Sequence, residues 1–155
     1  MAFVIDAFAK RIVGWRASTR MTTDFVLDAL EQAVYDRRPS ESDRLIHHSD
    51  RGSQDVSIRY TERLAKAGIN PSVGNTGSAY DNALAETING LYKMELIHRR
   101  TPWKTRAAVE LATLEWVSWF NHQRLLGSIR DVPPAEAEER YYRQLAAPTA
   151  EPVLL

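Results

Sequence analysis

The stretch Ser78-Ala-Tyr-Asp-Asn-Ala-Leu-Ala-Glu-Thr-Ile-Asn-Gly-Leu-Tyr-Lys93 is the best starting point for interpreting this 155-residue sequence. A segment rich in glycine, asparagine and serine, 74–78, leads into it. Ser78 or Asp81 can cap the start of a helix here, because their side-chain oxygens accept hydrogen bonds from the free amides of a first turn. The pattern that follows predicts a helix to about residue 97.

Three polar residues share one face of this predicted helix. Asn82, Glu86 and Lys93 are spaced four and seven residues apart, which brings them to the same side. A second carboxylate, Asp50, follows the short β-rich run 44–48. Mg²⁺ prefers such hard oxygen ligands, so we expect Asp50 and Glu86 to meet and to hold a divalent ion. The alternative is that Asp50 caps the next helix and Glu86 is a solvated helix residue.

Composition describes an ordinary globular chain. Hydrophobic residues make up 44% and charged residues 26%, and the length suits one domain. The formal net charge is zero, so a nucleic-acid surface would have to be a local patch. The chain has no cysteine, which suits the reducing cytoplasm, and we expect a cytoplasmic protein. No apolar run approaches the roughly 20 residues of a membrane span, so we expect no membrane partner.

The order of predicted elements is typical of an α/β protein. Two β-rich runs at the start of the chain, joined by residues 9–11, predict a hairpin. We expect a mixed sheet flanked by helices, with Asp50 at the carboxyl end of a strand, where such folds place functional residues. The domain would span 1–145, and 146–155 would be a frayed tail. The further elements are helix 22–37, strand 44–48, helix 53–67, edge strand 69–73, helix 78–97, helix 103–121 and helix 133–145.

Apolar and aromatic spacing predicts which helix faces point inward. In helix 53–67 these are Ile58, Leu64 and Ala65. Helix 103–121 carries a larger set, for which we expect core or dimer packing rather than base stacking. Its members are Trp103, Val109, Ala112, Leu114, Trp116, Val117, Trp119 and Phe120. His47 and His48 adjoin Asp50, and we interpret them as strand-end packing residues rather than metal ligands or a base.

A basic stretch follows the predicted carboxylate helix. Its members are Lys93, Arg99, Arg100, Lys104 and Arg106, against one acidic residue, Glu95. Such a patch can neutralise several phosphates and make binding salt-dependent, although surface solvation explains it equally well. Asn82 and Lys93 can hold a phosphate backbone beside the carboxylates. The nucleic-acid-binding candidates are therefore Asn82, Lys93, Arg99 and Arg100.

Two motifs at a fixed separation resemble a known family. His48-Ser-Asp-Arg-Gly-Ser-Gln54 and Tyr80-Asp-Asn-Ala-Leu-Ala-Glu-Thr87 place 35 residues between the two carboxylates. They resemble the integrase-like DDE transposases of bacterial insertion sequences, second-reading-frame products related to retroviral integrases. The opening Phe3–Trp15 is similar to the family's hairpin. Trp119–Arg124 with Pro133-Pro134 is similar to its C-terminal signature, so the resemblance extends to about Tyr142.

The resemblance implies a fold, a reaction and partners. The fold would be RNase H-like, as in integrase catalytic cores. The reaction would be DNA transposition, in which the element's ends are cleaved and a 3′-hydroxyl is transferred onto target phosphodiesters. Asp50 and Glu86 would be catalytic and metal-binding residues of a two-ion Mg²⁺ or Mn²⁺ site. The partners would be DNA and a second copy or a full-length transposase, with no small-molecule substrate.

The sequence departs from the family at one important point. The family carries a third acid, an Asp in a W-x-x-D-x-T pattern on the first, central strand, and this chain contains no such segment. Asp6 is not its replacement, because it suits a strand-end or turn position. We therefore expect the chain to lack that central strand and to leave unpaired backbone on both neighbouring strands.

This departure bears on the origin of the chain and on its function. The chain is a truncated or remnant transposase, or its start codon is misplaced, and on its own we expect it to be inactive. The alternative function is a non-catalytic protein that binds DNA or full-length transposase. A third class, a nuclease acting on RNA–DNA hybrids, is disfavoured by the signature between Trp119 and Pro134.

Overall fold

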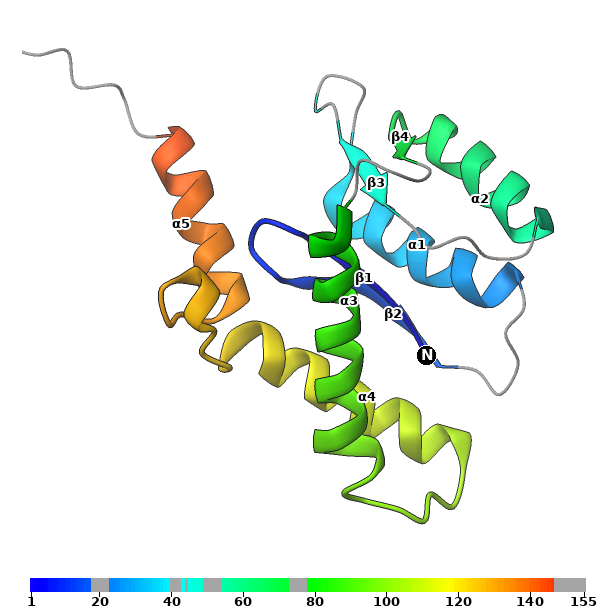
Figure 1. Cartoon of the computed structure of the whole chain (residues 1–155), viewed down its shortest axis with the longest axis vertical. Helices are drawn as coiled ribbons and strands as arrows, with labels where there is room; N and C mark the ends of the chain where they lie inside the picture. Colours follow the sequence, from blue (N-terminus) through cyan, green and yellow to red (C-terminus); the bar gives the residue numbers. More distant parts are fainter. Residues whose placement is uncertain (18–22, 40–42, 44, 49–53, 73–77, 147–155) are drawn as a thin grey trace, which may run out of the picture.

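The computed structural model describes residues 1–17, 23–39, 43, 45–48, 54–72 and 78–146 (Figure 1). Short strands and two helices share the first half of the chain, and the described part of the second half is helical. The strands are β1 (Ala2–Ile5), β2 (Ile12–Arg16), β3 (Ile46–His48) and β4 (Asn70–Ser72). The helices are α1 (Thr23–Arg37), α2 (Gln54–Lys66), α3 (Ser78–Tyr92), the π-helix η2 (Lys93–Ile97), α4 (Arg106–His122), the 3-10 turn η3 (Gly127–Ile129) and α5 (Pro134–Ala146).

The predicted hairpin is confirmed, and Asp6 shapes its turn. The Asp6 carboxylate accepts hydrogen bonds from the backbone amides of Phe8 at 2.9 Å and Ala9 at 3.2 Å. Lys10 adopts a left-handed conformation with φ of 64°, and its amide donates to the carbonyl of Asp6. A short acidic side chain suits this position because it can satisfy amides that the turn leaves free. Asp6 is therefore a turn residue, as the sequence indicated.

The described strands do not form the single mixed sheet that we expected. β1 pairs with β2 antiparallel, and β3 pairs with β4 in parallel, so that two separate two-stranded sheets result. Among the described strands, β1 and β3 each have only one strand neighbour. The α/β class and the flanking helices are as predicted.

Side-chain amides cover the outer edge of β2. Asn121 of α4 accepts a hydrogen bond from the amide of Ile12 and donates one to its carbonyl, both at 2.9 Å. Gln32 of α1 accepts from the amide of Trp15 at 3.1 Å. These side chains imitate a neighbouring strand and leave fewer unpaired backbone groups at this edge.

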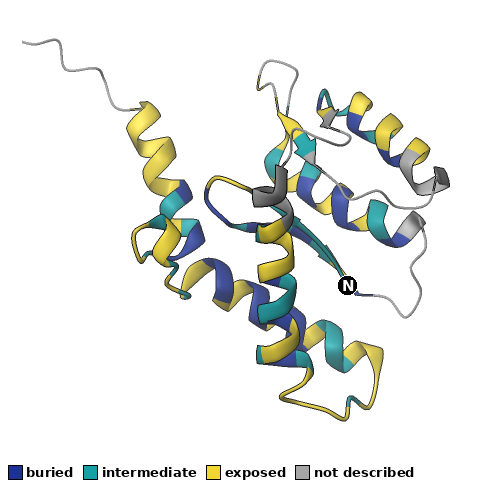
Figure 2. Ribbon diagram, viewed as in Figure 1, coloured by how far each residue is buried: buried dark blue, intermediate teal, exposed yellow. Residues whose placement is uncertain are grey.

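The buried residues form two clusters rather than one (Figure 2). The larger cluster joins β2, α3, η2 and α4 around Trp116 and Phe120. The smaller cluster joins α1 and α2 through Leu30, Tyr60 and Leu64. The C-terminal half of α5 is exposed. Its N-terminal half is anchored by the buried carboxylate of Glu138, which pairs with Arg11 of the hairpin turn and Arg37 of α1.

Several predicted helix faces were wrong in detail. Ile58 and Ala65 of α2 are exposed, and Tyr60 is buried in their place beside Leu64. A short amphipathic pattern allows more than one inward face, and contact with α1 decides between them. Leu114 of α4 is also exposed.

The start and end of two helices also differ from the prediction. α4 begins at Arg106 rather than at 103, because the Thr105 hydroxyl accepts a hydrogen bond from the amide of Ala108 and caps it. The predicted helix 78–97 is α-helical to Tyr92 and continues as a π-helix to Ile97. The amide of His98 accordingly bonds to the carbonyl of Lys93, five residues back.

Within the described residues, every helix is too short or too polar to cross a lipid bilayer.

Candidate active site and nucleic-acid interface

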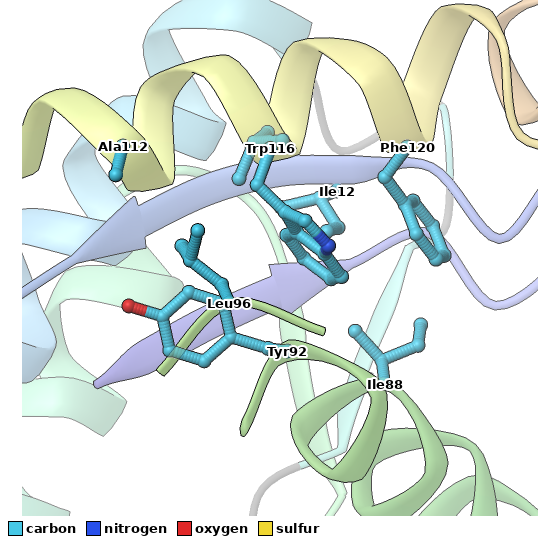
Figure 3. Packing of buried hydrophobic residues seen from close by; sticks show 8 residues of the cluster. Ile12, Ile88, Tyr92, Leu96, Ala112, Trp116 and Phe120 are labelled. Atoms are coloured by element: carbon cyan, nitrogen blue, oxygen red, sulfur yellow. The ribbon is translucent and has the colours of Figure 1, made fainter. Parts of the chain in front are cut away.

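Helix α3 is fixed against α4 and the hairpin by one buried face. Ile88 and Tyr92 of α3 pack with Trp116 and Phe120 of α4, as Figure 3 shows. Ile12 of β2 and Leu96 of η2 complete the same cluster. Aromatic rings meet edge-on within it, with the Tyr92 and Trp116 centroids 5.3 Å apart. The opposite face of α3 is held outward by this packing.

A buried hydrogen bond fixes the carboxyl end of α3. The Tyr92 and Thr113 hydroxyls lie 2.7 Å apart, and the Thr113 hydroxyl also lies 2.7 Å from the carbonyl of Val109. Burial raises the pKa of the Tyr92 phenol, and the hydrogen bond to Thr113 lowers it by less. The phenol therefore stays neutral and bonded across the range in which proteins work.

Glu95 is a positioning residue that sequence reasoning missed. It is the one acid in the basic stretch and looked like a solvated charge. Its carboxylate instead accepts a hydrogen bond from the Trp116 indole at 3.0 Å and pairs with Arg124. The Arg124 guanidinium lies over the Trp119 ring, 5.4 Å from its centroid. This ion pair connects the π-helix η2 to the C-terminal signature. Sequence spacing could not predict the pair, because Glu95 and Arg124 are 29 residues apart.

Glu86 lies on the outward face of α3. Its side chain is exposed, and no described residue forms a hydrogen bond or ion pair with it. The helix holds the carboxylate outward, and no described side chain occupies its oxygen lone pairs. Exposure on the helix suits the predicted metal-binding role and equally suits the alternative, a solvated helix residue.

The predicted partner of Glu86 is Asp50. Asp50 lies in 49–53, outside the described residues, as do the side chains of His48 and Asn82. His47 on β3 is described: its Nε2 lies 2.9 Å from the Tyr60 hydroxyl, and the two ring centroids are 5.2 Å apart with their planes tilted by 45°. Burial raises the pKa of Tyr60. His47 therefore serves in packing, as expected.

The carboxylate oxygens of Glu86 suit a hard cation, but a single carboxylate does not make a metal site. Among the described residues, no group of three acidic, histidine or cysteine side chains comes close enough to hold a metal ion. Within the described part of the chain, Glu86 is therefore the one predicted metal-binding residue whose position is known. Any further ligands would have to come from Asp50 or from another molecule.

The basic stretch is exposed as a whole. Lys93, Arg99, Arg100 and Lys104 are solvent-accessible and form no ion pair with described residues. Arg106 pairs with Glu110 one turn along α4, at 3.5 Å. The first four cations therefore remain available to an anionic partner. Lys93 follows Glu86 by seven residues, directly after the end of α3, and is exposed as Glu86 is.

Gly90 leaves an open space between Glu86 and Lys93. A Cβ built on Gly90 would meet no atom within 4 Å, although the residue is inside helix α3. A glycine inside a helix lowers stability by about 1 kcal/mol relative to alanine. At position 90 no close contact requires a glycine.

We expect Gly90→Ala to raise the free energy of unfolding by about 0.5–1 kcal/mol, because the added methyl group fits and the unfolded chain loses freedom. Urea denaturation measures it. The same change at Gly127, outside the α-helices, is the control and should give no comparable gain. A loss of stability at Gly90 would contradict an open helix face here.

Sequence comparisons identify the family of this chain. A family model described as "Integrase core domain" matches residues 1–79, and a second model of the same description matches residues 67–134. The chain belongs to the integrase core domain family. The resemblance to integrase-like transposases, which rested on short motifs, is thereby confirmed.

Relatives of this integrase core domain include insertion-sequence transposases. It is 59% identical over 145 residues to the transposase for insertion sequence element IS629 of Shigella sonnei, covering 94% of this chain and 48% of the relative. It is 58% identical over 153 residues to the putative transposase for IS986/IS6110 of Mycobacterium tuberculosis, covering 97% of this chain and 55% of the relative. The chain therefore spans about half the length of these relatives.

A solved structure supports the fold of this integrase core domain. A chain in the structure of a simian T-cell lymphotropic virus intasome in complex with PP2A regulatory subunit B56 gamma is similar, with a TM-score of 0.61. The match covers 97% of this chain and 49% of that chain, at 16% sequence identity. Likeness at this identity concerns the fold alone, and it confirms the integrase type of α/β fold.

Proposed function

We propose that this chain contributes two metal-binding carboxylates, Asp50 and Glu86, to DNA transposition by phosphodiester cleavage and strand transfer. The observation that carries the proposal is the exposed carboxylate of Glu86 on α3, with which no described residue pairs, in a member of the integrase core domain family. Insertion-sequence transposases among its relatives support DNA as the substrate. The reaction would take place in the cytoplasm.

In this proposal some residues bind the metal ion and others bind DNA. Asp50 and Glu86 would hold Mg²⁺ or Mn²⁺, which supplies charge neutralisation and an activated oxygen nucleophile. Asn82 and Lys93 would orient the phosphodiester beside Glu86, and Arg99 and Arg100 would hold the flanking backbone. With two carboxylates of a three-carboxylate family site, we expect no cleavage by this chain alone.

Mn²⁺ binding tests the site without requiring turnover. Paramagnetic Mn²⁺ should broaden the amide resonances of Ala83 and Thr87, which flank Glu86 on α3. Glu86→Gln and Asp50→Asn should each abolish the broadening, because each removes a charged ligand. Glu115→Gln is the control, since Glu115 is also exposed but lies on α4. Broadening that survives Glu86→Gln would refute the assignment.

A cleavage assay with Mg²⁺ or Mn²⁺ separates the enzymatic and non-catalytic readings. We expect the purified chain to show no cleavage. Cleavage that Asp50→Asn and Glu86→Gln each abolish would show instead that two carboxylates suffice. The second candidate function is a non-catalytic protein that binds DNA, which the exposed cations favour. Metal-independent DNA binding with no Mn²⁺ broadening at Glu86 would support it instead.

Salt dependence tests the basic surface. For duplex DNA, log K falls with log[salt] with a slope of about −0.9 for each phosphate neutralised. We expect the double variant Arg99→Ala and Arg100→Ala to reduce this slope by about 2. Fluorescence anisotropy with a short duplex measures it.

The matched control removes the same charge elsewhere. Arg140 and Arg143 of α5 pair one turn back with Glu136 and Glu139, so they are already neutralised. Replacing both by alanine should leave the slope unchanged. Equal losses in the two double variants would show that net charge, rather than this surface, governs binding.

A further inference from the structure

The C-terminal half of α5 is uncovered by the rest of the described chain. All residues of α5 from 139 to 146 are exposed, as Figure 2 shows, whereas Glu138 in its first half is buried. Residues three, four and seven positions apart share one side of a helix, so Tyr141, Tyr142 and Leu145 follow Glu138 on the same side. The side of α5 that packs against the fold at its start therefore continues along its end without described neighbours to cover it.

This uncovered side is apolar and aromatic. Tyr141 is 40%, Tyr142 55% and Leu145 65% exposed. Phe8 of the hairpin turn, itself 65% exposed, adds a ring whose centroid lies 4.9 Å from that of Tyr141. We call these four residues the α5 patch. Exposed apolar side chains that are gathered in this way, rather than scattered singly, mark an interaction site.

Opposite charges flank the α5 patch at two successive turns of the helix. Glu139 lies one turn before Arg143 and pairs with it at 2.6 Å. Both border a shallow recess of about 600 Å³ that Tyr142 also lines, beside the ion pair between Arg37 and Glu138. The flank of the patch therefore has an acidic position followed by a basic position.

This order of charges fits a second copy of the same helix in antiparallel orientation. With a twofold axis near Tyr141, Glu139 of one chain comes opposite Arg143 of the other, and the symmetry repeats the contact. The tyrosine rings of the two chains would meet near the axis, where edge-on and offset contacts are favourable. A parallel pair would instead bring Glu139 beside Glu139 and Arg143 beside Arg143, which is unfavourable.

We propose that the α5 patch is the interface through which two copies of this chain pair, with their α5 helices antiparallel. Four partly exposed side chains from each copy make a small interface, so we expect weak association with a dissociation constant of about 10–100 μM. Pairing through α5 requires neither a metal ion nor DNA. It therefore goes beyond the proposed function and is tested separately from it.

Sedimentation velocity of the full chain, over roughly 1 μM to 1 mM and without metal or DNA, measures pairing. Replacing Tyr142 and Leu145 together by glutamine should raise the dissociation constant at least about tenfold. The matched control replaces Leu111 and Leu114 of α4, which are 60% and 55% exposed, by glutamine and should leave the dissociation constant unchanged. Circular dichroism of dilute samples checks that both double variants remain folded.

Charge exchange tests the antiparallel orientation. Glu139→Arg and Arg143→Glu each place like charges across the interface, so each should weaken pairing about three- to tenfold. The chain that carries both exchanges should pair as the original does, because each arginine again meets a glutamate. In a parallel pair, Glu139→Arg would replace one like-charge contact by another and would change pairing little.

The control for charge exchange lies on the opposite side of the same helix. Arg140 pairs with Glu136 at 2.8 Å, in the same one-turn arrangement as Arg143 and Glu139. Glu136→Arg and Arg140→Glu change the net charge by the same amounts and break an equivalent pair within the helix. They should leave pairing unchanged, because they lie away from the α5 patch.

Three results would overturn the proposal. A chain that stays monomeric at the highest concentration would leave the α5 patch to another occupant, such as residues 147–155 of the same chain. Dissociation by the variants of Leu111 and Leu114, and not by those of α5, would assign the interface to α4. Equal weakening by Glu136→Arg and Glu139→Arg would show that net charge, rather than contact at the patch, governs association.

Discussion

Replacing Phe120 by alanine is expected to lower the free energy of unfolding by about 3–5 kcal/mol. Phe120 is fully buried, with 0% of its surface exposed, at the centre of the larger cluster. Its ring lies 5.2 Å from that of Trp116, and it packs with residues of β2 and α3. Truncation removes these contacts and leaves a cavity that rigid neighbours cannot fill. Urea denaturation monitored by circular dichroism measures the change.

The control for Phe120 lies on the same helix. Leu114 is 55% exposed, so Leu114→Ala should change the free energy of unfolding by no more than about 0.5 kcal/mol. A similarly small loss for Phe120→Ala would mean that α4 does not form the core with α3. Because that core holds α3, Phe120→Ala should also weaken Mn²⁺ binding at Glu86, although Phe120 lies on another helix.

Local signals predicted most elements of this fold. The hairpin, Asp6 in its turn, and α1 starting at Thr23 each follow from neighbouring residues, since turn chemistry and capping act over a few positions. The family resemblance also rested on short motifs, and the family match confirmed it.

Contacts between distant segments were not predictable in the same way. The pairing of Glu95 with Arg124, and the Asn121 amide that closes the edge of β2, join residues far apart in the sequence. Tyr60 rather than Ile58 faces inward because α1 is on that side. Spacing within one segment cannot show which neighbour will cover it, so these residues looked like ordinary surface or helix positions.

Replacing Gly14 by alanine is the second change with a large expected effect, a loss of about 2–3 kcal/mol in the free energy of unfolding. A Cβ at Gly14 would lie 2.2 Å from the carbonyl oxygen of Ala29, and 3.1 Å from the amide nitrogen of Ala33. Both atoms belong to the backbone of α1, so no side-chain rotation can relieve the clash. An isolated glycine in a strand can mark such a close approach, and this was the available sequence signal.

The same substitution at Gly127 separates the clash from general effects of losing a glycine. A Cβ at Gly127 would have only an ordinary contact, 3.6 Å from the Asp131 carboxylate. Gly127→Ala should therefore change stability little, while Gly14→Ala should force β2 away from α1 and break the bond from Trp15 to Gln32. Hydrogen exchange at the Trp15 amide reports that break directly. Unchanged protection there, with unchanged stability, would mean that β2 and α1 are farther apart than the structure places them.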